Sequence, residues 1–227
     1  MIATKKRLLI FASGTANGGG SGFRKLAEAA RDGTVSFEIA GAVSNHENGG
    51  VRKIAKEFGI QFHYFEKPFN SGKYRYFFDM AKADFAALSG WTIKVLGLPE
   101  DKTFNIHPAP VFVDYSSGEL VLKFGGRGWF GHSVHERVLE AFRRGEITHS
   151  AVVMHFVTGD IDGGPVFFRI DVPISPDDDA DKLGKRVNQN EHYFQAAITD
   201  LVVSGKIRLE KGKVIVPEWY PFLPQCR

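Results

Sequence analysis

The fold is decided by the stretch Arg7-Leu8-Leu9-Ile10-Phe11-Ala12 together with the glycine-rich run that follows it at residues 13–22. The first six residues form an apolar segment of strand length, which predicts a buried strand. Apolar residues then recur at helical spacing, at Phe23, Leu26, Ala27 and Ala30. A strand, a glycine loop and a helix in this order present backbone N–H groups and a helix N-terminus to an anion.

The glycine loop is therefore interpreted as a phosphate-binding loop. Its glycines are spaced irregularly, at Gly14, Gly18, Gly20 and Gly22, which fits the dinucleotide fingerprint poorly. It also lacks the Gly-Lys-Ser/Thr ending of a P-loop. The alternative is a flexible surface loop, although a run so rich in glycine is costly to order without a ligand.

Strands and helices alternate through the first half of the chain. Further strands are expected at residues 37–44, 60–65, 84–88 and 103–107, and helices at residues 51–58 and 71–82. This alternation predicts parallel pairing in a doubly wound α/β sheet, where ligands bind at the carboxyl ends of the strands. We expect the glycine loop, Ser89-Gly90-Trp91 and the end of the 103–107 strand to meet at that edge.

The second half of the chain is less regular. We expect a hairpin and a glycine loop within residues 111–128, helices at 132–144 and 180–204, strands at 149–157 and 166–172, and a hairpin at 207–216. The acidic run Asp177-Asp178-Asp179 is interpreted as a helix start rather than a metal site, because the N-terminal dipole favours carboxylates. No repeat or low-complexity linker divides the sequence, so a single domain of residues 1–227 is expected.

The composition is that of an ordinary globular protein, with 43% hydrophobic and 24% charged residues. The net charge of +3 comes from scattered lysines and arginines, which argues against a nucleic-acid partner. No apolar run approaches the length of a membrane span, and residues 8–12 are too short for the core of a signal peptide. The single cysteine, Cys226, excludes an intrachain disulfide and indicates a reducing compartment. We expect a cytoplasmic protein.

The stretch Asn105-Ile106-His107-Pro108 ends the 103–107 strand. Side chains alternate along a strand, so Asn105 and His107 are expected on the same face. Pro108 has no N–H and ends the ladder. A strand end with two polar residues is the alternative interpretation, because short motifs also match by chance.

A carboxylate at Asp162 gives this pair a chemical role. Asn105, His107 and Asp162 together supply a hydrogen-bond donor, a proton carrier and a carboxylate, which acyl transfer to an amine requires. The Asn105 amide would hold the oxyanion, His107 would carry the proton, and Asp162 would stabilise the imidazolium. No cysteine or serine nucleophile is expected nearby, so direct transfer without a covalent intermediate is the simplest mechanism.

The sequence resembles the folate-dependent formyltransferases, and among them the phosphoribosylglycinamide formyltransferase family. The first motif is Asn105-Ile106-His107-Pro108, and the second runs from His155-Phe156-Val157-Thr158 through Asp162-Gly163. The resemblance covers roughly residues 7–205. It implies a Rossmann-like doubly wound, mostly parallel formyltransferase fold with a small C-terminal hairpin. His155 has a second interpretation as a buried structural histidine.

The resemblance also implies the reaction and the residues. The donor would be the co-substrate 10-formyltetrahydrofolate, the acceptor the amine of glycinamide ribonucleotide, and no metal would take part. The implied catalytic residues are Asn105, His107 and Asp162. The implied substrate-binding residues are Gly20, Ser21, Gly22, Pro108 and Glu191. The implied cofactor-binding residues are Trp91, Ile93, Val95, Thr158 and Asp160. Residues 1–100 would bind phosphate and substrate, residues 101–205 would hold catalysis and folate, and residues 206–227 would form a tail.

Two departures from the family pattern concern the acceptor. The glycine loop is longer than in the family, with Gly22 where an asparagine is usual, and residues 109–131 form an insertion. The alternatives are therefore transfer to another amine, such as an amino sugar nucleotide, or a non-catalytic folate- or nucleotide-binding relative. A nicotinamide dehydrogenase is disfavoured, because Ser44-Asn45 stands where an acidic ribose-binding residue is expected. Partners would be small molecules, without nucleic acid or membrane, and the protein a monomer or homodimer.

Overall fold

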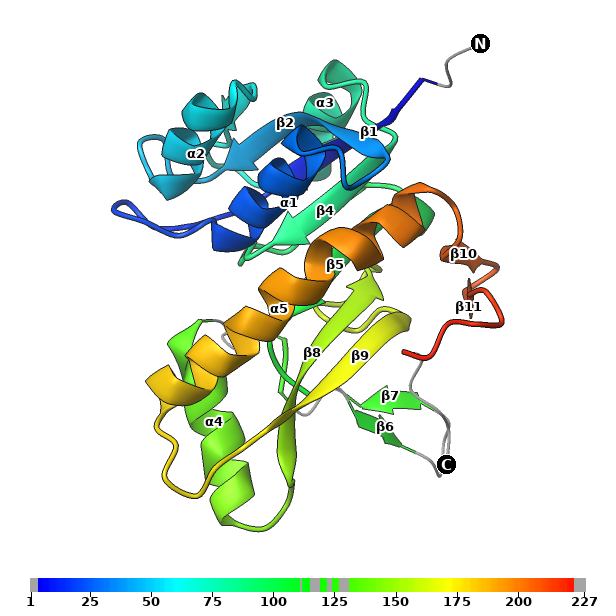
Figure 1. Cartoon of the computed structure of the whole chain (residues 1–227). Helices are drawn as coiled ribbons and strands as arrows, with labels where there is room; N and C mark the ends of the chain where they lie inside the picture. Colours follow the sequence, from blue (N-terminus) through cyan, green and yellow to red (C-terminus); the bar gives the residue numbers. More distant parts are fainter. Residues whose placement is uncertain (1–3, 111, 115–118, 122–123, 127–130, 223–227) are drawn as a thin grey trace.

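The computed structural model describes residues 4–110, 112–114, 119–121, 124–126 and 131–222. A seven-stranded sheet forms its centre, with strand order β3-β2-β1-β4-β5-β8-β9 (Figure 1). Its strands are β1 (Lys6–Phe11), β2 (Phe37–Ser44), β3 (Phe62–Tyr64), β4 (Phe85–Ser89), β5 (Thr103–His107), β8 (His149–Phe156) and β9 (Val166–Pro173). Pairing is parallel from β3 to β5 and antiparallel in β5–β8 and β8–β9. The expected doubly wound, mostly parallel sheet is confirmed.

The helices are α1 (Ser21–Arg31), α2 (Gly50–Phe58), α3 (Ser71–Met80), α4 (His132–Arg143) and α5 (Ala180–Val203), with a short 3₁₀ turn η1 (Glu100–Lys102). Helices α1, α2, α4 and α5 pack on one face of the sheet, and α3 packs on the other. Strand β1 is buried on both faces: Leu8 and Ile10 belong to the first core, and Leu9 and Phe11 to the second. This explains why its sequence is a continuous apolar run rather than an alternating one.

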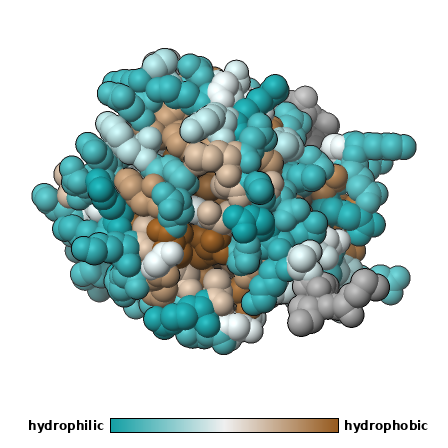
Figure 2. All heavy atoms as spheres, turned by 90° about the horizontal axis from the view of Figure 1, so that it is seen from above, coloured by the Kyte–Doolittle hydropathy of each residue, from teal (hydrophilic) through white to brown (hydrophobic). Residues whose placement is uncertain are grey.

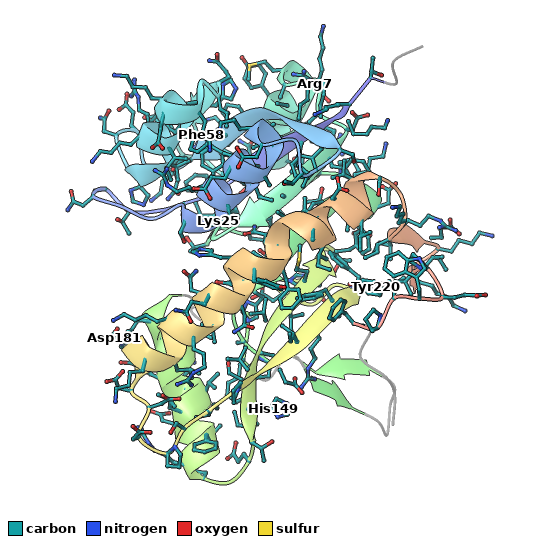
Figure 3. The ribbon with its side chains drawn as sticks, viewed as in Figure 1. Arg7, Lys25, Phe58, His149, Asp181 and Tyr220 are labelled. Atoms are coloured by element: carbon teal, nitrogen blue, oxygen red, sulfur yellow. The ribbon has the colours of Figure 1, made fainter. Side chains whose placement is uncertain are left out.

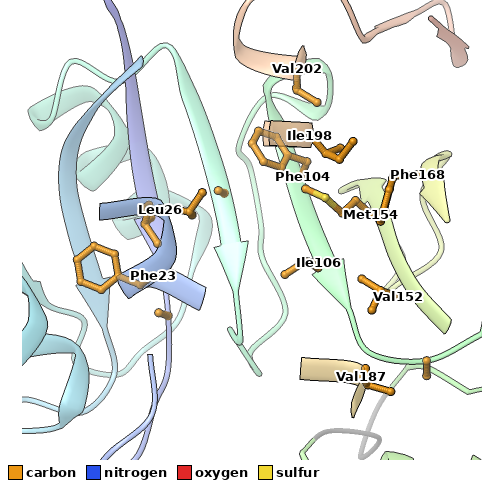
Figure 4. Packing of buried hydrophobic residues seen from close by; sticks show 14 of the residues in the cluster. Phe23, Leu26, Phe104, Ile106, Val152, Met154, Phe168, Val187, Ile198 and Val202 are labelled. Carbon is orange, nitrogen blue, oxygen red and sulfur yellow. The ribbon is translucent and has the colours of Figure 1, made fainter. Parts of the chain in front are cut away.

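The larger core joins the two halves of the sheet. Phe23 and Leu26 of α1, Phe104 of β5, Met154 of β8 and Ile198 of α5 are all members of it (Figure 4). Each of these side chains is at most 3% exposed. Residues from both the 1–100 and the 101–205 segments therefore share one core.

Two small hairpins lie outside the sheet, β6 (Phe112–Asp114) with β7 (Glu119–Val121) and β10 (Arg208–Glu210) with β11 (Lys213–Ile215). The expected C-terminal hairpin is confirmed. After it comes the tail with Tyr220 (Figure 3). Tyr220 packs against Phe222, and Phe222 packs against Phe168 of β9. The Phe222 carbonyl accepts a hydrogen bond from the Arg169 N–H at 3.1 Å, so the tail lies against the outer edge of β9.

Most expected elements agree with the structure within two residues, and the third strand keeps only half of its expected length. Strand β3 covers only Phe62–Tyr64, whereas residues 60–65 were expected. The Ile60 N–H donates instead to Ala55 O at the end of α2, after Gly59 has taken the left-handed conformation. Ile60 therefore belongs to the C-terminal cap of α2, and the strand begins two residues later, at Phe62.

Polar side chains cover much of the surface. Hydrophilic residues surround a central apolar patch on the face in Figure 2. Within the described part of the chain, no helix combines the length and hydropathy needed to cross a membrane.

The core position of Phe37 gives a stability prediction. Its ring is fully buried in the larger core, at the start of β2. Phe37→Ala leaves a cavity there and is expected to lower the free energy of unfolding by about 3–5 kcal/mol. Urea denaturation measures this loss.

Tyr76→Ala is the matched control, because this aromatic residue of α3 is 60% exposed. Its free energy of unfolding is expected to change by about 0.5 kcal/mol or less. Equal losses for the two variants would contradict the packing described here.

Candidate active site

Two cavities meet at the carboxyl edge of the sheet, beside the point where the strand order reverses between β1 and β4. The first, here called the 158–162 cavity, has a volume of about 610 Å³. The second, the glycine-loop cavity, has a volume of about 560 Å³. Asn105, Trp91 and Thr92 line both cavities. Two ligands of ordinary size bound in these cavities would meet at Asn105.

The 158–162 cavity contains every residue that was expected to bind the cofactor: Trp91, Ile93, Val95, Thr158 and Asp160. Two contacts hold the Trp91 ring in place. Its indole N–H donates to Tyr74 Oη at 3.1 Å, and its ring packs edge-on against Phe11. Apolar side chains of the 91–95 segment face the 158–162 loop across the cavity. Such a lining suits a flat ring system with polar groups at its edge.

The glycine-loop cavity contains every residue that was expected to bind substrate: Gly20, Ser21, Gly22, Pro108 and Glu191. The loop is held by internal bonds, since the Thr15 N–H donates to Gly18 O at 2.8 Å and the Gly50 N–H donates to Thr15 O at 3.3 Å. Gly19 has φ of 81°, and a Cβ there would lie 2.6 Å from Gly14 Cα. The loop leads into the N-terminus of α1, whose first N–H groups have no partner within the helix and favour an anion.

Gly22 lies where α1 approaches α5 and β4. A Cβ at this position would lie 2.3 Å from Ser89 Oγ and 2.7 Å from Gln195 Oε1. The Gln195 amide in turn donates to Ser89 Oγ at 2.9 Å. A side chain at position 22 would displace those of Ser89 and Gln195, so with glycine there the polar groups at this point of the cavity come from β4 and α5.

One face of α5 forms the opposite wall of the glycine-loop cavity. Gly184, Asn188, Glu191, His192 and Gln195 line it at helical spacing. The Asn188 amide donates to Glu191 Oε2 at 3.1 Å. Burial raises the pKa of Glu191 to about 7, although the bond from Asn188 opposes this shift. A carboxyl group that is half ionised near neutral pH thus faces this cavity.

The Asn105 side chain lies between two partners. Its amide nitrogen is 3.2 Å from Asp162 Oδ1 and 3.2 Å from His155 Nε2. His155 Nδ1 lies 2.8 Å from the Phe156 carbonyl, which only accepts, so Nδ1 carries the ring proton and Nε2 accepts from Asn105. His155 is 1% exposed and is satisfied on both nitrogens, which matches its interpretation as a buried structural histidine. Both hydrogens of the Asn105 amide are therefore engaged.

His107 is 4% exposed and lies beneath residues 124–126. Its Nε2 donates to the Phe124 carbonyl at 2.6 Å, and its Nδ1 faces Asp162 Oδ2 at 3.7 Å. Burial lowers the His107 pKa, while the Asp162 carboxylate opposes this effect. Among the described lining residues of the two cavities His107 is absent, although Asn105 and Pro108 on either side are present.

The Asp162 carboxylate is the common partner of these groups. It accepts from Asn105 through Oδ1 and from the Gly126 N–H through Oδ2, at 3.2 and 2.9 Å. Burial disfavours its charge, but the rings of His155 and His107 and the Gly126 N–H outweigh burial and lower the Asp162 pKa to about 2. Its φ of 54° lies in the left-handed region, which residues other than glycine seldom adopt outside functional sites.

Sequence reasoning missed three contributors to the site. Gln195 follows Glu191 by four residues and so shares its helical face, a spacing that predicts it. His135 lines the glycine-loop cavity from α4, and burial lowers its pKa to about 4. Residues 124–126 contribute through backbone atoms, which no residue type reveals. In the part of the chain that the structure describes, no cluster of three or more histidine, cysteine or acidic residues has metal-binding geometry.

Comparison with known proteins gives a consistent picture. Residues 6–199 match the family model described as formyl transferase. The chain is 28% identical over 221 residues to the chloroplastic phosphoribosylglycinamide formyltransferase of Arabidopsis thaliana, covering 92% of this chain and 70% of that protein. For the Vigna unguiculata enzyme of the same name, the identity is 28% over 220 residues, covering 92% of this chain and 65% of that protein. The chain thus spans about two thirds of the length of these plant relatives.

A solved structure supports the fold. The glycinamide ribonucleotide transformylase 1 of Symbiobacterium toebii superposes with a TM-score of 0.75 at 18% identity, covering 94% of this chain and 95% of that chain. At this identity the likeness concerns the fold alone. The family match and the geometry of the site carry the functional argument.

Glu191 gives a pH prediction. Its pKa is about 7 in the folded protein, against an ordinary value of 4.5, so the folded state holds the proton more strongly than the unfolded state. The resulting stabilisation is present below pH 4.5 and is lost as pH rises through 7, on the order of 3 kcal/mol. Urea denaturation between pH 4.5 and 8 measures this loss.

Glu191→Gln removes the titrating group and is expected to flatten the profile over this range. Glu100→Gln, at an exposed position in η1, is the control and is expected to keep the wild-type profile. A Glu191→Gln profile as steep as that of the wild type would contradict the assignment.

Proposed function

The chain belongs to the formyl transferase family, and we propose that it transfers a formyl group from 10-formyltetrahydrofolate to the amine of glycinamide ribonucleotide. The observation that carries this proposal is the meeting of the two cavities at Asn105, next to Asp162. A donor in one cavity and an acceptor in the other would bring their reacting groups to the same amide. The names of the plant relatives support the choice of acceptor.

The 158–162 cavity is proposed as the folate site. Its apolar walls and its volume of about 610 Å³ suit the flat ring of a folate, and backbone groups of its loops are available for the ring edge. Trp91, Ile93, Val95, Thr158 and Asp160 would hold the donor there. The formyl group would lie toward Asn105 and Asp162, which line the same cavity.

The glycine-loop cavity is proposed as the acceptor site. The N-terminus of α1 at Gly20, Ser21 and Gly22 would bind the phosphate through backbone N–H groups and the helix dipole. The Glu191 carboxyl on the opposite wall is a hydrogen-bond partner for hydroxyl groups of a ribose. An acceptor in this arrangement would extend past Pro108 toward Asn105.

The reaction needs one proton transfer and no covalent enzyme intermediate. The neutral amine attacks the formyl carbon, a new C–N bond forms, the C–N bond to the donor breaks, and a proton passes from the attacking to the leaving nitrogen. With its Nε2 proton held by Phe124, neutral His107 would accept this proton on Nδ1 and later return it. Protonated Nδ1 would then face the Asp162 carboxylate, which stabilises the imidazolium.

Asn105 would stabilise the oxyanion, and its resting contacts determine which hydrogen becomes available. One amide hydrogen bonds a carboxylate, and the other bonds neutral His155. Bonds to charged acceptors are the stronger, so the bond to His155 would yield first when an oxyanion forms. Asp162 would keep the amide in place throughout.

A second acceptor class, another amine such as an amino sugar nucleotide, rests on the departures of the glycine loop and of residues 109–131 from the family pattern. Among the described residues that line the glycine-loop cavity, none is a lysine or an arginine. The phosphate groups of either acceptor would depend there on backbone N–H groups and histidines. A non-catalytic folate- or nucleotide-binding relative remains the third candidate.

The remaining parts of the proposal concern context. The division into residues 1–100, 101–205 and 206–227 is retained as a proposal, as is a monomeric or homodimeric protein acting on small molecules alone. The cytoplasm is proposed as the compartment on the basis of the single cysteine, Cys226, which lies outside the described residues. A plastid is the alternative, because the two plant relatives are named chloroplastic.

His107→Ala tests the catalytic assignment. Loss of the proton carrier is expected to lower kcat for formyl transfer to glycinamide ribonucleotide by about 10²- to 10⁴-fold. The release of tetrahydrofolate from 10-formyltetrahydrofolate, followed by absorbance, measures the rate, and mass spectrometry identifies the formylated product.

His149→Ala is the control, because His149 is partly exposed at the start of β8 (Figure 3) and lines neither cavity. This variant is expected to leave the rate unchanged. Product with an amino sugar nucleotide and none with glycinamide ribonucleotide would select the second acceptor class. Folate binding without transfer to any amine would select the binding protein. An undiminished rate for His107→Ala would refute the mechanism.

A further inference from the structure

The segment of residues 124–126 contacts both members of the proton-transfer pair. The Phe124 carbonyl accepts from His107 Nε2 at 2.6 Å, and the Gly126 N–H donates to Asp162 Oδ2 at 2.9 Å. Both contacts use main-chain atoms. The two side chains face each other with 3.7 Å between His107 Nδ1 and Asp162 Oδ2.

Gly125 lets this backbone approach so closely. A Cβ at this position would lie 3.2 Å from Asp162 Cβ and Oδ2 and 3.4 Å from His107 Nε2. Distances of 3.2 Å are tighter than ordinary van der Waals contact, so an added methyl group would force the segment and the pair apart by a few tenths of an ångström. The close approach also keeps water away, since His107 is 4% exposed.

The carbonyl of Phe124 determines which ring nitrogen of His107 carries the proton. A carbonyl only accepts hydrogen bonds, so Nε2 is the protonated nitrogen of the neutral ring. Nδ1 then presents its lone pair to the side of Asp162. The Gly126 N–H meanwhile donates a hydrogen bond to the Asp162 carboxylate. The backbone of Asp162 is in the left-handed conformation, which contacts with neighbouring groups must stabilise.

We propose that the backbone of residues 124–126 is a positioning element for the reaction, which fixes the His107 proton on Nε2 and leaves Nδ1, opposite Asp162, as the nitrogen that exchanges a proton. This inference rests on the proposed formyl transfer and deepens it. It assigns a role to a segment within the insertion at residues 109–131. The segment acts through His107 and Asp162, without contact to the reacting atoms.

Gly125→Ala tests the positioning. Displacement of the segment is expected to lower kcat by about 10- to 100-fold with little change in the KM of either substrate, because orientation is lost while both cavities remain. Gly72→Ala is the matched control on α3, where a Cβ would meet only Asn70 Oδ1 at an ordinary 3.5 Å. The control is expected to keep the wild-type kcat. Wild-type kcat in a folded Gly125→Ala protein would overturn the proposal.

The pH dependence separates positioning from a general loss of structure. His107 must be neutral to accept a proton, so kcat rises as pH increases through its pKa. Burial lowers that pKa in the wild type and outweighs the Asp162 carboxylate and the Phe124 carbonyl, which raise it; Asp162, His155 and His135 are the titratable neighbours. Displacement of the segment admits water, so the acidic limb of the Gly125→Ala profile is expected to move to higher pH. An unmoved limb with reduced kcat would indicate a structural role alone.

The tautomer of His107 is measured directly in the wild-type protein by nitrogen-15 NMR of the imidazole rings. The His107→Gln variant assigns its signals. The expected result at neutral pH is a neutral ring with the proton on Nε2; a proton on Nδ1 would overturn the proposal even if Gly125→Ala fails to fold. Absence of formyl transfer by the wild type would refute the proposed function instead. The tautomer would still show whether the Phe124 carbonyl holds the His107 proton on Nε2.

Discussion

The polar site depends on the carboxylate of Asp162, whose side chain is 12% exposed. A charged group in this position is stable only when its oxygens are satisfied, and Asn105 and Gly126 each supply an N–H to one oxygen. The same two bonds orient the amide that lines both cavities and the backbone that covers His107. Loss of the carboxylate would therefore release a strand side chain and a distant loop together.

The sheet explains why these groups meet. Asn105 and His107 leave the end of β5 on one face, while Asp162 reaches them from the loop between β8 and β9. β8 pairs with β5 in antiparallel register, with His155 opposite Asn105. Strand β8 ends beside the amino end of β5, where Phe156 lies opposite Phe104. The 158–162 loop then folds back toward Asn105, where Asp162 accepts its hydrogen bond.

Much of this was predictable from local signals. A continuous apolar run gives β1 its bounds, because both faces of this strand are buried. Pro108 ends β5, because it has no N–H for the ladder. The paired motifs identify Asn105 and Asp162. The contacts of residues 124–126 with His107 and Asp162 were not predictable. They use a main-chain carbonyl and a main-chain N–H, which almost every residue has, so the sequence does not show that Phe124 and Gly126 supply them. The start of β3 was likewise not predictable, because the sequence at Ile60 fits both a strand and the cap of α2, and only the structure shows that it caps the helix.

The tail at Tyr220 and Phe222 has a consequence for solubility. A sheet that ends in a long bare strand invites a second copy to add to it, and proteins avoid this by shortening or covering their edges. Here one edge, β3, has only three residues, and the other, β9, carries the Phe222 carbonyl on its Arg169 N–H. The tail thus covers part of the β9 edge, where a strand of a second copy would otherwise pair.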